Sequence, residues 1–163
     1  WRGIVDIVSG GFPCQAFSTA ARGRNVAHNL WPEMYRVVKE VDPIYVFAEN
    51  VSAAAIERAA TDLTALGYKA DMLSLSAKDL GGDHIRRRYW LLAYSDDKSK
   101  LRSLVNAKAR ELPELRESIW AAAPGNSGVS NGFSTRVDRY RATGNGQVPV
   151  VAAAALWALA NAD

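Results

Sequence analysis

The sequence GIVDIVSGGFPCQAFS, residues 3–18, joins a short apolar run to a turn that carries the only cysteine of the 163-residue chain. The run Gly3–Val8 predicts a buried strand, so Cys14 follows a strand end. In open α/β sheets, loops at the carboxyl ends of strands converge on the ligand-binding edge. Gly10 and Gly11 permit a sharp turn, and Pro13 fixes the approach to Cys14. A cysteine that only packs in the core needs no such turn, so the pattern favours a nucleophile over a small buried hydrophobic residue.

Strand-like and helix-like segments alternate after this turn, which predicts an α/β fold. The apolar periodicity and the positions of proline and glycine define the segments. In chain order, we expect a helix over residues 30–41, a strand over 44–48, a helix that ends at Gly67, strands over 68–75 and 89–94, and a terminal helix whose apolar face begins at Val148.

The strand over residues 44–48 runs directly into Glu49-Asn50-Val51. A carboxylate at the exit of a buried strand is poorly solvated, which raises its pKa and allows it to act as an acid near neutral pH. The alternative is a capping or salt-bridging role before the next helix. Asn50 is expected to cap that helix.

Three consecutive arginines precede the strand over residues 89–94. Because alternate residues of an extended segment face the same side, Arg86 and Arg88 share one face and Arg87 takes the other. Charge runs are usually solvated, but two arginines leading into a buried strand suit an anion or a polar base edge. Arg22 and Arg24 lie in an aperiodic segment that predicts a loop, either a plain connector or a phosphate contact.

The composition is that of an ordinary soluble globular domain, with 48% hydrophobic and 23% charged residues. A net charge of +3 permits a polyanionic partner without requiring one. No apolar run approaches the ~20 residues of a membrane span, and one cysteine excludes an internal disulfide, so we expect a cytoplasmic protein. The chain begins with Trp1 rather than methionine, and we expect it to be a fragment.

Four motifs, in this order, resemble those of the DNA (cytosine-5)-methyltransferases. They are the cysteine loop over residues 10–18, the Glu-Asn-Val triplet at 49–51, the arginine motif HIRRR at 84–88, and GNGQVP at 144–149. His84 stands where the family has glutamine in the arginine motif. The cysteine loop is the most specific of the four, and the others gain weight from their order and spacing.

The resemblance implies a partial Rossmann-like fold of the S-adenosylmethionine-dependent methyltransferases. We expect a mostly parallel sheet with flanking helices, with the amino-terminal cofactor-binding strands missing. Residues 1–95 are expected to form the catalytic part and residues 96–135 a short recognition region or insertion. Residues 136–163 are expected to return to the catalytic domain.

The resemblance also implies the reaction. Cys14 would add to C6 of a flipped-out cytosine, Glu49 would bind the base and share a proton with it, and S-adenosylmethionine would give its methyl group to C5. The expected catalytic residues are Cys14, Glu49, Arg86 and Arg88. The cofactor pocket would include Pro13, Leu30, Asn145 and Val148. The double-stranded DNA would be contacted by Gln15, Ser18, Arg22, Arg24, Asn50, Arg136 and Arg139. No metal ion and no membrane partner are expected, and the protein would be of bacterial or phage origin.

Two other functions remain open because the cofactor half is not in this sequence. One is a catalytically inactive DNA-binding remnant, and the other is one half of a split methyltransferase whose cofactor half lies on a separate chain. We therefore expect the isolated chain to be inactive or weakly active. A cofactor-independent thiol enzyme is less favoured, because neither His28 nor His84 can be placed beside Cys14 from the sequence.

Overall fold

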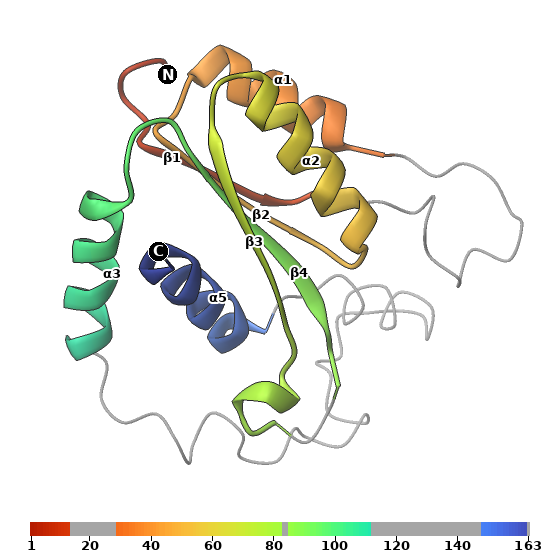
Figure 1. The fold of residues 1–163 in the computed structure, drawn as a ribbon, viewed down its shortest axis with the longest axis vertical. Coiled ribbons are helices and arrows are strands. Elements are labelled where there is room, and N and C mark those ends of the chain that lie inside the picture. The colour runs from red at the N-terminus through yellow and green to blue at the C-terminus, as the bar shows by residue number, and fades with distance from the viewer. Residues whose placement is uncertain (14–28, 83–84, 112–147, 163) are drawn as a thin grey trace, which may run out of the picture.

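The computed structural model describes residues 1–13, 29–82, 85–111 and 148–162, and its core is a four-stranded sheet in the order β1-β2-β4-β3 (Figure 1). Helices α1 and α2 cover one face of this sheet, and α3 and α5 cover the other. The strands are β1 (Ile7–Gly11), β2 (Tyr45–Asn50), β3 (Lys69–Leu75) and β4 (Arg88–Tyr94). The helices are α1 (Trp31–Val41), α2 (Ala53–Ala65), the short 3-10 helix η3 (Lys78–Leu80), α3 (Ser99–Glu111) and α5 (Pro149–Asn161).

The mixed α/β architecture confirms the expected fold class, but the strand pairing is not mostly parallel. β1 pairs with β2 in parallel, whereas β4 lies between β2 and β3 and is antiparallel to both. Strands β1, β2 and β3 therefore run in one direction and β4 runs against them. Among the described residues of the link from β3 to β4, the one helix is η3, and the twelve-residue link is too short for the helical crossover that a parallel return usually requires.

Strands β2 and β4 are buried on both faces, which explains their continuous apolar sequence. Val46 and Leu91 pack beneath α1 and α2, in a core with Ile56 and Leu63 of α2. Along the same strands, Tyr45, Trp90 and Leu92 face a second core. That core is completed by Leu101 of α3 and by Val151, Ala155 and Leu159 of α5. In the described ranges, no helix is long and apolar enough to span a bilayer.

Strand β1 begins and ends later than the apolar pattern predicts. The first residues form a turn in which the Ile4 amide donates to the Trp1 carbonyl at 3.0 Å, and the Ile4 side chain is 77% exposed. The strand then continues through both glycines, because Gly11 still pairs with Glu49 in the parallel register. The turn toward the cysteine therefore starts only at Phe12.

Helix α3 packs against the second core and against α5. Leu101 is buried and Val105 packs on the second core. Arg102 Nε donates to the Ala160 carbonyl of α5 at 3.0 Å. The first turns of α3 thus complete the second core, and the expected division of the chain at residue 95 stays a prediction. Residues 112–135, the rest of the predicted insertion, lie outside the described part of the chain.

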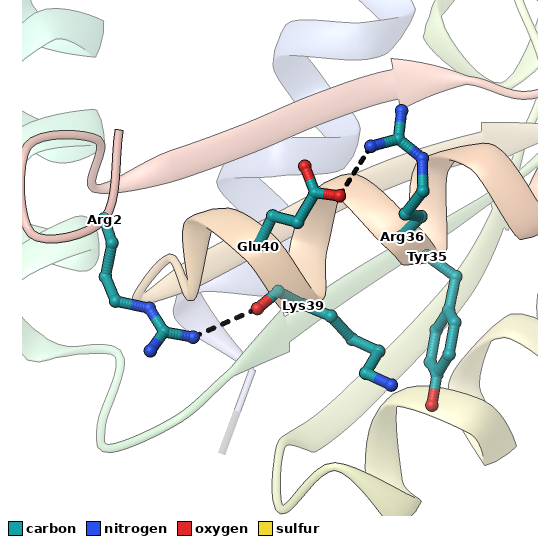
Figure 2. A pocket seen from close by; sticks show the side chains of 5 residues that line it. All are labelled: Arg2, Tyr35, Arg36, Lys39 and Glu40. Carbon is teal, nitrogen blue, oxygen red and sulfur yellow. Dashed lines mark hydrogen bonds and ion pairs between the residues drawn. The ribbon is translucent and has the colours of Figure 1, made fainter.

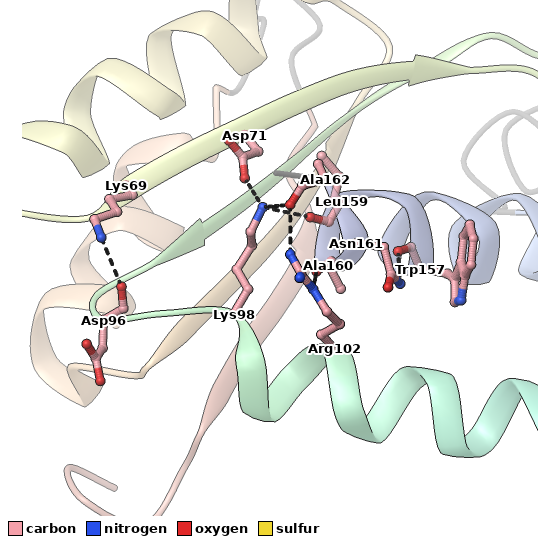
Figure 3. A network of polar contacts seen from close by, with 10 residues as sticks. All are labelled: Lys69, Asp71, Asp96, Lys98, Arg102, Trp157, Leu159, Ala160, Asn161 and Ala162. Carbon is pink, nitrogen blue, oxygen red and sulfur yellow. Dashed lines mark hydrogen bonds and ion pairs between the residues drawn. The ribbon is translucent and has the colours of Figure 1, made fainter.

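Lys98 lies at the junction of β3, α3 and α5 and is only 7% exposed (Figure 3). Its ammonium group donates to Asp71 Oδ2 at 2.7 Å, to the Ala162 carbonyl at 2.7 Å and to the Leu159 carbonyl at 3.3 Å. A lysine ammonium has three donors, so these acceptors satisfy it fully. Two of them are carbonyls from the end of α5 that have no partner within the helix. Lys98 therefore holds the last turn of α5 against the sheet.

Replacing Lys98 by methionine is expected to lower the free energy of unfolding by roughly 2–4 kcal/mol. Methionine replaces the apolar stem of the lysine side chain, but Asp71 and the end of α5 lose their shared donor. The expected loss lies below that of a fully buried pair because Asp71 is 29% exposed. Urea denaturation measures the effect. The matched control is Lys100→Met, which removes an exposed ion pair to Asp6 and should cost about 0–1 kcal/mol. Equal losses in the two variants would contradict the assigned role.

Candidate active site at the ends of strands β2 and β4

A partly buried ion pair connects the last residues of β2 to the first residue of β4. Arg88 Nε lies 2.9 Å from Glu49 Oε1, and the two side chains are 17% and 12% exposed. Glu49 pairs with Trp90 across the antiparallel ladder. Directly paired residues, and residues two apart in one strand, project from the same face, so Glu49, Arg88 and Trp90 all lie on the α5 side of the sheet. The pair thus lies where the sheet meets the start of α5.

Arg86 adds a second guanidinium beside this pair. Burial lowers the pKa of Arg86, and the positive charge of Arg88 lowers it further, while Glu49 acts in the opposite direction. Arg87 is exposed, and its Nη1 lies 3.4 Å from Ser74 Oγ. The expected alternation is confirmed: Arg86 and Arg88 line one small cavity, and Arg87 does not.

Asn50 connects the end of β2 to the turn that leads to Cys14. Its Nδ2 donates to the Phe12 carbonyl at 2.7 Å, and its Oδ1 accepts from the Ser52 amide at 3.0 Å. The residue is only 2% exposed. In this structure the buried amide of Asn50 bonds within the chain, and its expected contact with DNA stays a prediction. Asn50 does not cap α2, since the cap is Ser52, whose hydroxyl accepts from Ala55.

Replacing Asn50 by alanine is expected to destabilise the protein by about 1–3 kcal/mol, because a buried carbonyl loses its donor. Equilibrium unfolding in urea measures the loss. The control is Asn106→Ala, which removes a partly buried contact to Asn161 on the far side of the molecule. A loss for Asn50→Ala no larger than that of the control would show that the contact to Phe12 contributes little.

The residues expected to bind the cofactor fall into two places. The Leu30 amide donates to the Pro13 carbonyl at 3.3 Å, so these two residues adjoin at the start of α1. Pro13 is exposed, and Leu30 is 41% exposed. Val148 lies instead at the start of α5, beside Arg86 and Arg88. The structure brings Pro13 and Leu30 together but places Val148 with the arginines.

The remaining expected site residues lie outside the described part of the chain. They are Cys14, Gln15, Ser18, Arg22, Arg24, Arg136, Arg139 and Asn145. The sequence reasoning also missed Trp90, which lines the same cavity as the arginines. The alternation that joined Arg86 to Arg88 extends to residue 90, so the signal was present in the sequence.

A larger hollow of about 520 Å³ lies on the outer side of α1, lined by Arg2, Tyr35, Arg36, Lys39 and Glu40 (Figure 2). It is not the candidate site, because both of its arginines already have partners: Arg36 contacts Glu33 and Glu40, and Arg2 donates to the Lys39 carbonyl. Hydrogen bonds to these two glutamates raise the pKa of Arg36. In the residues that the structure describes, no cluster of histidine, cysteine, aspartate or glutamate could hold a metal ion.

Comparison with known proteins identifies the family. The model of the C-5 cytosine-specific DNA methylases matches residues 2–153. The type II methyltransferase M.AgeI of Thalassovita gelatinovora is 33% identical over 103 residues, which cover 58% of this chain and 24% of that protein. M.HhaI of Haemophilus parahaemolyticus is 30% identical over 102 residues, which cover 56% of this chain and 31% of that protein. A crystal structure is known for a DNA modification methyltransferase encoded within a prophage of Escherichia coli. Its chain is 30% identical to this one, the match covers 55% of this chain and 26% of that chain, and the TM-score is 0.40.

Fold and site together define an α/β protein with a partly buried carboxylate–guanidinium pair at the edge of its sheet. The chain belongs to the C-5 cytosine-specific DNA methylase family. It spans about a quarter to a third of the length of the curated relatives named above.

Proposed function

We propose that these residues form the catalytic and carboxyl-terminal part of a DNA (cytosine-5)-methyltransferase. The enzyme would transfer a methyl group from S-adenosylmethionine to C5 of a cytosine flipped out of double-stranded DNA. The observation that carries the proposal is the partly buried pair of Glu49 and Arg88 at 2.9 Å. It lies at the end of the sheet, beside the turn that leads through Pro13 to the only cysteine. Family membership supports the same reaction.

The nucleophile of the proposed reaction is the thiolate of Cys14. Cytosine is too electron-poor at C5 to attack a methyl group directly. Addition of the thiolate to C6 breaks the C5–C6 double bond and makes C5 a nucleophile, which is covalent catalysis. After C5 has gained the methyl group, it loses its proton, the double bond forms again and the thiolate leaves. The thiol is therefore regenerated in each turnover.

Glu49 and the arginines would hold the base during this addition. The carboxyl group of Glu49 would share a proton with N3 and so stabilise the electrons that the thiolate pushes into the ring. Arg88 would keep Glu49 in place through the 2.9 Å contact, and with Arg86 it would hold the base carbonyl. Arg88 is the first residue of β4 and Arg86 lies two residues before it, so the strand would fix the direction from which the two guanidinium groups approach the base.

S-adenosylmethionine supplies an electrophilic methyl group when it is bound. Pro13 and Leu30 fit this cofactor, because they adjoin at the end of β1 and offer exposed apolar surface to its adenosine part. Asn145 and Val148, from the approach to α5, would complete the pocket. The methyl-transfer assay distinguishes a pocket completed by this polypeptide from one completed by a separate chain.

Flipping a cytosine out of the duplex costs a few kcal/mol, which contacts to the DNA backbone must offset. Arg22, Arg24, Arg136 and Arg139 would make such contacts, together with Gln15 and Ser18 of the cysteine loop. The segment over residues 112–135 would contribute to sequence recognition. The site of action would be the cytoplasm of a bacterial or phage-infected cell.

The test is methyl transfer by the protein expressed from its complete reading frame. Radiolabelled S-adenosylmethionine and duplex DNA are incubated with the protein, and the DNA is hydrolysed to bases. The proposal predicts label in 5-methylcytosine. Label that appears only after a second chain is added would indicate a split enzyme. Salt-sensitive DNA binding with no cofactor binding and no label would overturn the proposal in favour of a DNA-binding remnant.

A further inference from the structure

Trp90 is a buried polar residue that the reaction above does not use. It lies in the centre of β4, is 2% exposed and stacks on Phe47 with ring centroids 5.3 Å apart. Its indole Nε1–H has no hydrogen-bond acceptor among the described residues. Buried donors almost always have a partner, since an unpaired one loses its bond to water without replacement. The indole group therefore points to an acceptor that the described residues do not provide.

A small cavity of about 10 Å³ lies next to this indole, between β4 and the first turn of α5. Trp90, Arg86 and Arg88 line it together with Val148 and Val151. The polar side chains among these can only donate hydrogen bonds, so an oxygen acceptor is complementary to the cavity. The volume matches a single water molecule, and a carboxylate or phosphate would not fit.

We propose that this cavity holds one enclosed water molecule that accepts hydrogen bonds from Trp90 Nε1 and from the guanidinium group of Arg88. Arg88 and Trp90 are two residues apart on the same face of β4, so one water can reach both. Empty cavities in proteins are apolar, whereas this one is lined by charged and polar donors. Trp90 is then a positioning residue, because the water that it holds fixes the guanidinium that binds Glu49.

The presence of the water is independent of the reaction, whereas its catalytic consequence rests on the proposed function. Arg88 Nε already contacts Glu49, and Arg88 Nη1 donates to the Arg87 carbonyl at 2.8 Å. The water adds a further restraint on the same planar group, which makes the guanidinium less able to rotate away from the carboxylate. Loss of the indole N–H should therefore loosen the pair without removing either of its members.

The test compares Trp90→Phe with Trp157→Phe in the protein expressed from its complete reading frame. Phenylalanine keeps the stack on Phe47 but lacks the N–H group. Trp157 is 48% exposed on α5, so its variant controls for the loss of one indole. In nitrogen-15 NMR spectra, the Trp90 indole signal, identified by its absence in Trp90→Phe, should show a cross-peak to a long-lived water. Absence of that cross-peak would overturn the proposal.

Two further readouts test positioning. In Trp90→Phe, the solvent exchange of Arg88 Nε–H should accelerate about tenfold, and kcat for methylation should fall about tenfold, with KM for S-adenosylmethionine within twofold. Neither change is expected in Trp157→Phe. Unchanged exchange and kcat would overturn the positioning role even if the water is present. If the wild-type protein does not methylate DNA, the proposed function fails, but the cross-peak and the Arg88 exchange still decide this inference.

Discussion

Replacing Cys14 by serine is expected to reduce methylation by the protein from its complete reading frame to the uncatalysed background. A hydroxyl group ionises far less readily than a thiol, and the neutral hydroxyl is a poor nucleophile toward C6. Without the covalent bond, C5 does not become nucleophilic and no other residue of the site replaces this step. The measurement is the rate of label transfer from S-adenosylmethionine to duplex DNA, with DNA binding as a check that the variant still engages its substrate.

The single cysteine provides an independent control for this variant within the 163 residues. A thiol-alkylating reagent should inactivate the wild-type protein at the same rate at which it labels Cys14. Bound DNA should slow both processes equally if the cysteine faces the flipped base. Retention of methylation in Cys14→Ser, or full activity after alkylation of Cys14, would refute its role as the nucleophile.

Replacing Glu49 by glutamine is expected to lower kcat about 10²- to 10³-fold, the usual loss when one group that stabilises developing charge is removed. The amide has nearly the same shape, but it cannot share a proton with N3. It also leaves Arg88, which is 17% exposed, without its carboxylate partner at 2.9 Å. Steady-state kinetics with the duplex and the cofactor varied in turn measure the change.

The matched control is Glu57→Gln, the same substitution at an exposed position of α2. It should leave kcat within about twofold, because surface substitutions away from a site have small effects. Thermal unfolding of both variants separates a loss of chemistry from a loss of fold. A Glu49→Gln protein that is folded and as active as the control would rule out the proposed interaction with the base.

Helices α1, α2 and α5 were predictable from the sequence because they follow from local apolar periodicity, whereas α3 formed in a segment expected to be a recognition region or insertion. Helix α2 buries Ile56, Ala59, Ala60 and Leu63 as their spacing indicates. The direction of β4 was not predictable in this way. An apolar run has the same pattern in a parallel and an antiparallel strand, and only the short link through η3 imposes the reversal.

The candidate site was predictable where a residue type has a chemical role, and was missed where its role depends on a partner distant in sequence. Glu49 and Arg88 stood out as charges at the ends of apolar strands. The contact of Asn50 with the Phe12 carbonyl, 38 residues away, leaves no local pattern. Lys98 looked like one charge in a polar segment, because its partners at the end of α5 lie about 60 residues further along.

The most direct test of the proposed function is covalent trapping with a duplex that contains 5-fluorocytosine. In the presence of S-adenosylmethionine, the protein from its complete reading frame should add Cys14 to C6 and methylate C5. Fluorine cannot leave as a cation, so the thiol is not released. The account predicts a denaturation-resistant protein–DNA adduct that requires both Cys14 and the cofactor. A folded protein that binds this duplex and forms no adduct would contradict it.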